Sequence, residues 1–139
     1  MEYIRESINK SKKWRFDRRI IHNNKYICKM ENGFVSWERI NDNKFNYSEK
    51  GKLNFILESK KLDFQTNLVF IFNNKNKYNV FKQNGDLFYK SNSKNKSVNY
   101  LYGKKYVIEV RKVNNIITTS VEVSYDDKIE NTITNYHLE

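Results

Sequence analysis

The chain has little of what most catalytic and metal sites require. Its 139 residues include four glycines, two histidines, one cysteine, and no proline or alanine. Four scattered glycines do not form a glycine-rich phosphate loop, and no serine has the glycine context of a nucleophile elbow. A metal site needs three or four converging ligands, whereas His22 and His137 have neither a cysteine nor a carboxylate at ligand spacing. Cys28 has no partner in the chain. We therefore predict no metal site and no catalytic residue.

Long apolar runs are also absent. No segment reaches the roughly 20 apolar residues that cross a bilayer as a helix, and residues 1–13 are charged where a signal peptide would be apolar. We expect a cytoplasmic protein without a membrane span. With 139 residues and 38% hydrophobic content, the chain is sized for one domain with one modest core. These features leave cofactors and oligomeric state open.

The formal net charge of +10 comes from an excess of lysine. Clustered basic residues would indicate a nucleic-acid partner, because they release counterions from phosphates. Here the lysines are spread along the chain with carboxylates between them. That pattern favours a solvated surface. A basic module that binds RNA or an acidic protein surface remains the alternative hypothesis.

The first residues predict a helix, since Tyr3, Ile4 and Ile8 have roughly helical spacing. We expect residues 1–12 to form a short helical segment that covers one end of the core.

Apolar and polar residues then alternate, which is the pattern of a strand with one buried face. Trp14 and Phe16 should point inward, and Lys13, Arg15 and Asp17 outward. The same alternation recurs along the chain in about ten short strands, separated by polar turn signals. The clearest turn signals are His22-Asn23-Asn24, Asn32-Gly33, Lys50-Gly51 and Asn84-Gly85.

Ten strands with one apolar face each would leave long exposed edges in an open sheet. The predicted fold class is therefore all-β, a closed antiparallel β-barrel of about ten strands with a short N-terminal helix. Residues 13–138 should form this single barrel domain. A barrel of this size can retain space for one small ligand.

Arg18 shares the inward face of its strand with Trp14 and Phe16, and a buried charge needs compensation. In one interpretation its guanidinium packs on an aromatic plane such as Trp14 and bonds to Glu49 or to backbone carbonyls. In the other interpretation Arg18 anchors the carboxylate of a ligand.

Several tyrosines could line a cavity, where each ring adds apolar area and each hydroxyl a directional contact. Ordinary core packing is the alternative. The candidates are Tyr47, Tyr78, Tyr100, Tyr102, Tyr106 and Tyr136. Glu49 lies on the same strand face as Tyr47, where it could pair with Arg18 or act as a general acid or base if buried.

Four segments in order resemble DUF6314, a family of unknown function with a calycin or lipocalin-like barrel. The opening pattern Trp-x-x-x-Arg-x-Ile is Trp14, Arg18 and Ile20, and Tyr-x-Glu-x-Gly-x-Leu is Tyr47, Glu49, Gly51 and Leu53. A later hairpin of the family is matched by Tyr78, Val80, Asn84, Gly85, Phe88 and Tyr89 of this chain. The closing pattern of the family is matched by Lys128, Thr134 and Tyr136. Where the family has His-x-Cys-x-x-Asp-x-Tyr, this chain has Asn99, Leu101, Lys104 and Tyr106. Any function that rests on that His, Cys or Asp is therefore not carried over.

These observations lead us to expect a non-enzymatic barrel that binds a small amphipathic or aromatic molecule. The expected ligand-binding residues are Trp14, Arg18, Tyr47, Glu49, Tyr106 and Tyr136. The RNA-binding or acidic-surface-binding module is the runner-up, and an enzyme is the third alternative.

Overall fold

The computed structural model describes residues 4–74 and 76–138, which form one helix and ten strands. The elements are α1 (Ile4–Lys10), β1 (Lys13–His22), β2 (Lys25–Arg39), β3 (Lys44–Phe55), β4 (Lys60–Phe72), β5 (Lys77–Lys82), β6 (Leu87–Asn92), β7 (Ser97–Leu101), β8 (Lys104–Val113), β9 (Ile116–Tyr125) and β10 (Lys128–Leu138). None of the helical residues described is part of a helix long and apolar enough to cross a membrane.

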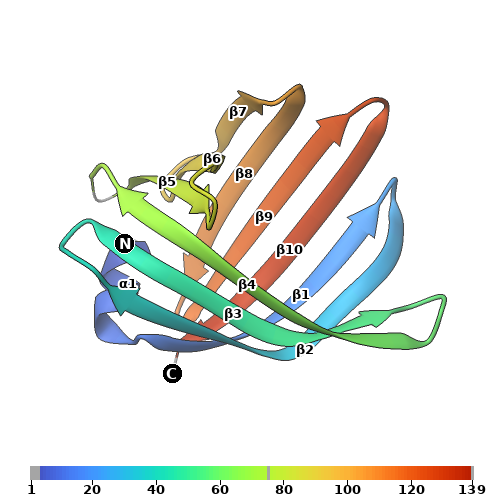
Figure 1. Cartoon of the computed structure of the whole chain (residues 1–139), viewed down its shortest axis with the longest axis horizontal. Helices are drawn as coiled ribbons and strands as arrows, with labels where there is room; N and C mark the ends of the chain where they lie inside the picture. The colour runs from blue at the N-terminus through green and yellow to red at the C-terminus, as the bar shows by residue number, and fades with distance from the viewer. Residues whose placement is uncertain (1–3, 75, 139) are drawn as a thin grey trace.

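The strands form one antiparallel sheet in the order β6-β5-β4-β3-β2-β1-β10-β9-β8-β7. Consecutive strands are neighbours because short turns join them, and the pairing of β1 with β10 joins the two halves of the chain. The sheet curls so that β6 and β7, its two edges, approach each other (Figure 1). The prediction of an all-β antiparallel sheet of about ten strands is confirmed, and the barrel is nearly closed.

The seam between β6 and β7 is joined by side chains. Among the described residues no backbone ladder pairs these two strands. Instead, the Asn99 amide on β7 accepts a hydrogen bond from the Lys90 backbone N–H on β6 (2.7 Å) and donates one to the Lys90 carbonyl (2.9 Å). The backbone N–H of Asn92 donates to the Ser97 hydroxyl (2.7 Å). One asparagine side chain thus satisfies both backbone groups of one edge residue.

Two of the predicted turns are wrong. Asn32-Gly33 lies inside β2, and Lys50-Gly51 lies inside β3, so each of these strands is longer than expected. The pairing of β2 with β3 shifts register between Glu31 and Phe34, and Asn32 has a positive φ of 55°. Asn-Gly therefore forms a β-bulge that bends β2. A dipeptide that tolerates positive φ suits a hairpin turn and a bulge equally well.

Gly33 is required at the bulge by the packing of a neighbouring strand. A Cβ atom at Gly33 would overlap the ring of Phe16, which is buried on β1. The absence of a side chain lets β2 approach β1 closely enough to cover that ring.

The alternation in β1 is as predicted. Trp14 and Phe16 are buried, Lys13 and Arg15 are exposed, and Asp17 is partly exposed on the outer face. The turns at Asn23-Asn24 and Asn84-Gly85 are also confirmed, with positive φ at Asn23, Asn24 and Gly85.

The two ends of the barrel differ. Helix α1 covers the end where β1 begins and β10 finishes (Figure 1), and its Ile4 and Ile8 are buried there in the hydrophobic core. The predicted helix is confirmed over Ile4–Lys10, and Tyr3 lies outside the described residues. Around the helix the interior is filled by edge-to-face aromatic rings, including Trp14 against Trp37 at 5.2 Å and Trp37 against Tyr47 at 4.9 Å.

Candidate functional site

The opposite half of the barrel is hollow. A cavity of about 430 Å³ lies between the two halves of the sheet, a volume within the range of small-molecule sites. Its apolar walls include Ile20, Phe64, Leu68, Phe70, Phe88, Val121 and Val123. Its polar lining includes Arg18, Tyr47, Glu49, Thr66, Lys82, Tyr89, Lys104, Tyr106, Tyr125, Glu130, Thr132, Thr134 and Tyr136.

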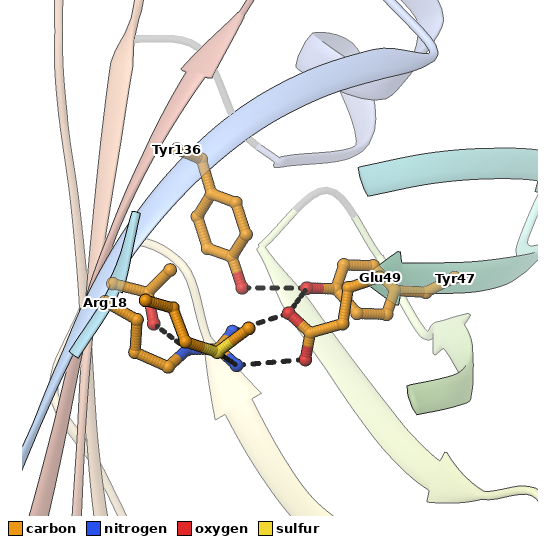
Figure 2. A network of polar contacts seen from close by, with 6 residues as sticks. Arg18, Tyr47, Glu49 and Tyr136 are labelled. Atoms are coloured by element: carbon orange, nitrogen blue, oxygen red, sulfur yellow. Dashed lines mark hydrogen bonds and ion pairs between the residues drawn. The ribbon is translucent and has the colours of Figure 1, made fainter. Parts of the chain in front are cut away.

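A buried ion pair forms the floor of this cavity. The Arg18 guanidinium on β1 donates from Nη2 to Glu49 Oε2 on β3 at 2.7 Å and from Nη1 to Oε1 at 3.1 Å (Figure 2). Its Nε donates to the Thr134 hydroxyl on β10 at 2.8 Å, and Nη1 also contacts the Met30 sulfur at 3.9 Å. The two charged side chains are 10% and 5% exposed. All three guanidinium nitrogens of Arg18 thus have partners within the protein.

Two tyrosines extend this network. The Tyr47 hydroxyl lies 3.0 Å from Glu49 Oε2 and 3.1 Å from the Tyr136 hydroxyl. A carboxylate only accepts hydrogen bonds, so Tyr47 donates its single proton to Glu49. Tyr136 must then donate to Tyr47. Figure 2 shows the resulting chain, which runs from Tyr136 through Tyr47 and Glu49 to Arg18.

The electrostatics keep Arg18 charged and the two tyrosine hydroxyls neutral. Burial acts to lower the pKa of Arg18, but attraction by the Glu49 carboxylate and by the nearby tyrosine oxygens leaves that pKa above its ordinary value. Burial raises the pKa of Tyr47 well above its ordinary value and also raises the pKa of Tyr136. Both phenols therefore stay protonated at neutral pH and can donate as described.

The residue that packs on Arg18 differs from the prediction. The ring of Phe16 lies under the guanidinium at 4.8 Å, and Trp14 is not in that position. Trp14 packs against Trp37 and, at 5.6 Å, against Tyr136 on the helix side of the network. Trp14 therefore supports the ring of Tyr136 from behind, whereas the other five predicted site residues line the main cavity.

The candidate tyrosines divide into three groups. Tyr47, Tyr106 and Tyr136 line the main cavity, whereas Tyr78 lines a small void beneath it and a separate hollow over β5, β6 and β7. The expectation that Tyr100 and Tyr102 line the interior is wrong, because they are 75% and 69% exposed. Asn99 takes the inward position on β7, which turns Tyr100 outward, and Tyr102 lies in the following turn with a φ of 54°.

Four further lining residues were not among the predicted site residues, although Phe88 and Tyr89 belong to the hairpin that resembles the family. Phe88 and Tyr89 stand on the short strand β6, and their rings lie 5.0 Å apart. Adjacent strand residues normally face opposite sides, so alternation would not place both in one cavity. Lys82 and Lys104 were counted with the other lysines, because composition does not distinguish a cavity lysine from a surface lysine.

A larger hollow of about 660 Å³ lies elsewhere, over the middle of β2, the second half of β3 and the beginning of β4. It is lined mainly by side chains on the outer face of those strands, such as Glu31, Lys50 and Lys52. No network of buried polar groups among the described residues underlies it, so the smaller interior cavity is the stronger candidate site. Among the described residues no group of three or more His, Cys, Asp or Glu side chains is arranged to hold a metal ion.

Comparison with known proteins gave a family match and a similarity to a solved structure. No curated protein matched the sequence. A protein described as a "De novo design of a fluorescence-activating beta barrel" has a similar structure, with 8% sequence identity, a TM-score of 0.46 and 93% of each chain covered. The model of a family of unknown function, DUF6314, matches residues 11–106. The matched range includes Arg18, Tyr47 and Glu49 and ends before Thr134 and Tyr136. The chain belongs to the DUF6314 family.

Proposed function

We propose that this protein is a non-enzymatic binding protein that holds one small amphipathic or aromatic molecule inside the barrel, as calycins do. The observation that carries the proposal is the interior cavity of about 430 Å³, with apolar walls above an ordered polar floor. Pockets of this composition bind small molecules because the walls supply apolar area and a few fixed polar groups supply orientation.

The ordered floor supports binding without chemistry. Glu49 accepts two hydrogen bonds from Arg18 and one from Tyr47. A carboxylate held in this way is not free to take a proton from a bound molecule, which argues against a general base. Arg18 is similarly occupied, so we assign it to the support of Glu49 and Tyr47 rather than to direct capture of a ligand carboxylate.

The RNA-binding alternative is less well supported by the distribution of lysine. Lysines stand on β1, β2, β3, β4, β5, β6, β8 and β10. They therefore surround the barrel instead of forming one basic stripe. If a polynucleotide were the partner, its affinity would fall steeply with added salt, whereas binding in the cavity would change little.

A neutral fluorescent probe tests the proposal. N-phenyl-1-naphthylamine emits more strongly in apolar surroundings, and its titration into the protein should give saturable binding. Thr132 lines the cavity, whereas its neighbour Asn131 does not, and both are half-buried on β10. Thr132→Trp should block the cavity and weaken binding by about tenfold or more.

The matched variant Asn131→Trp should bind the probe within about twofold of the unmodified protein. Circular dichroism and thermal unfolding establish that each variant is folded, and Thr132→Phe offers a smaller obstruction if the tryptophan is not tolerated. Absence of saturable binding, or equal binding by the Thr132 and Asn131 variants, would show that the cavity is not a binding site.

A further inference from the structure

The mouth of the cavity carries an excess of positive charge. The ionisable residues that line the cavity, tyrosines aside, are Arg18, Lys82 and Lys104 against Glu49 and Glu130. Arg18 and Glu49 neutralise each other at the floor. Two ammonium groups and one carboxylate remain nearer the open end.

Both lysines stand beside aromatic rings at the rim. Lys82 is the last residue of β5, and its Nζ lies 5.6 Å from the ring of Phe88. Lys104 is the first residue of β8, and its Nζ lies 4.6 Å from the ring of Tyr125. These ring contacts hold the two ammonium groups at the rim beside apolar surface.

The two ammonium groups have no anionic partner in the part of the chain that the structure describes. No ion pair joins Lys82 or Lys104 to any described carboxylate, Glu130 included. Phe88 also packs against Tyr106 at 6.3 Å, and Tyr106 lies two residues beyond Lys104 on the same face of β8. Lys82 therefore borders the Phe88–Tyr106 ring pair, and Lys104 stands on the same strand face as Tyr106.

The floor is unsuited to an anion. The hydroxyl protons of Tyr47 and Tyr136 are already donated along the chain to Glu49, so these groups offer a ligand only lone pairs. An anion placed there would also lie beside the Glu49 carboxylate in a buried site. The floor should accept a hydrogen bond from a ligand or contact its apolar end.

We infer that the ligand is an amphipathic anion whose apolar or aromatic body enters the cavity and whose carboxylate or sulfonate stays at the mouth, next to Lys82 and Lys104. This inference rests on the proposed function. It sets the orientation of the ligand opposite to that of an anion anchored on Arg18.

Two probes that differ by one sulfonate test the inference. 8-Anilinonaphthalene-1-sulfonate carries the charge, and N-phenyl-1-naphthylamine has the same rings without it. The variant Lys82→Met/Lys104→Met keeps the aliphatic stems against Phe88 and Tyr125 but removes both charges. It should weaken binding of the sulfonate probe by about three- to tenfold, the effect of losing two partly exposed ion pairs. Binding of the neutral probe should stay within about twofold.

The matched control is Lys90→Met/Lys105→Met. These two lysines are exposed and do not line the cavity, so the control removes the same net charge from the outer surface. It should leave the affinity for both probes within about twofold, because exposed charges that do not line the cavity are solvated and contribute little to binding. If the variant Lys82→Met/Lys104→Met is unstable, Lys82→Gln/Lys104→Gln removes the same charges with polar side chains.

The outcomes separate the two proposals. If Lys82→Met/Lys104→Met loses affinity for the sulfonate probe but not for the neutral probe, the inference is supported. An unchanged affinity for the sulfonate probe, or an equal loss of affinity in the control Lys90→Met/Lys105→Met, overturns the inference. In either case, saturable binding of the neutral probe leaves the proposed function standing. If Thr132→Trp leaves both probes bound, the cavity is not the site and both proposals fail.

Discussion

Arg18 shows how one buried charge depends on contacts from three other strands. Its partners lie on β2, β3 and β10, between 12 and 116 residues away in sequence. Removal of one member of a buried pair leaves the other charge without compensation, which costs more than removal of both. The pair is therefore expected to be strongly coupled.

Arg18→Met should lower the free energy of unfolding by about 3–5 kcal/mol, because Glu49 would be left buried and unpaired. The double variant Arg18→Met/Glu49→Leu should recover most of that loss. Urea denaturation of the two variants and of Glu49→Leu gives the coupling energy. Equal stability of the single Arg18 variant and the unmodified protein would mean that the pair is not buried in solution.

Gly33 supplies a second test, of side-chain packing. Gly33→Ala forces a methyl group against the Phe16 ring, which should cost about 1–3 kcal/mol through overpacking. Phe16→Leu in the same chain should relieve part of this cost. Gly51→Ala is the milder comparison, because its Cβ would meet the flexible end of Met30 at 3.0 Å and the Gly33 Cα at 3.3 Å, against 2.4 Å to the Phe16 ring at Gly33. A larger loss of stability at Gly51 than at Gly33 would contradict the packing described for the bulge.

The seam between β6 and β7 is the element that departs most from an ideal barrel. Both strands are short, with six and five residues, and no backbone ladder joins them in the described chain. The amide of Asn99 substitutes for that ladder at Lys90. The seam should therefore open more readily than the pairs between long strands, because local stability follows the number of buried contacts and hydrogen bonds.

Asn99→Ala should remove both hydrogen bonds to Lys90 and cost about 1–3 kcal/mol. Amide hydrogen exchange should speed up at Lys90 and change little at the centre of β1. Asn95→Ala, in the turn between β6 and β7, is a control that does not touch Lys90. Unchanged exchange at Lys90 in the Asn99 variant would show that the side chain does not hold the seam.

Across the barrel as a whole, buried tyrosines link folding to alkaline pH. Burial raises the pKa of Tyr47, Tyr78, Tyr89, Tyr106 and Tyr136 above the ordinary value near 10. Below about pH 10 these groups are protonated in both the folded and the unfolded chain, so they do not change the stability with pH. Above that pH the unfolded chain loses their protons while the folded protein keeps them.

Stability should therefore fall as the pH rises above about 10, by up to about 1.4 kcal/mol per pH unit for each such tyrosine. Tyrosinate absorbance near 295 nm and far-ultraviolet circular dichroism should change together as these residues ionise. The variant Tyr47→Phe/Tyr136→Phe should show a shallower loss of stability. Complete ionisation of all tyrosines in a protein that retains its dichroism would contradict the raised pKa values.

Much of the candidate site was predictable from local patterns. Inward orientation is a property of each strand, because side chains alternate with a period of two. Arg18, Tyr47, Glu49 and Tyr136 could therefore be assigned to the interior without knowledge of the pairing. The pairing of Arg18 with Glu49 could be expected as one of two possibilities, since a buried guanidinium requires an acceptor.

Local sequence patterns were enough to establish the strand character of the chain, the short N-terminal helix and the inward face of β1, because hydrophobic periodicity acts within a few residues. The folded structure was needed to establish that Asn32-Gly33 is a bulge, that Phe16 and not Trp14 lies under Arg18, and that Tyr100 faces outward. It was also needed to place Lys82 and Lys104 at the border of the cavity. Each of these outcomes depends on which strands meet across the barrel, and that is set by long-range packing and close approach, which local spacing does not encode.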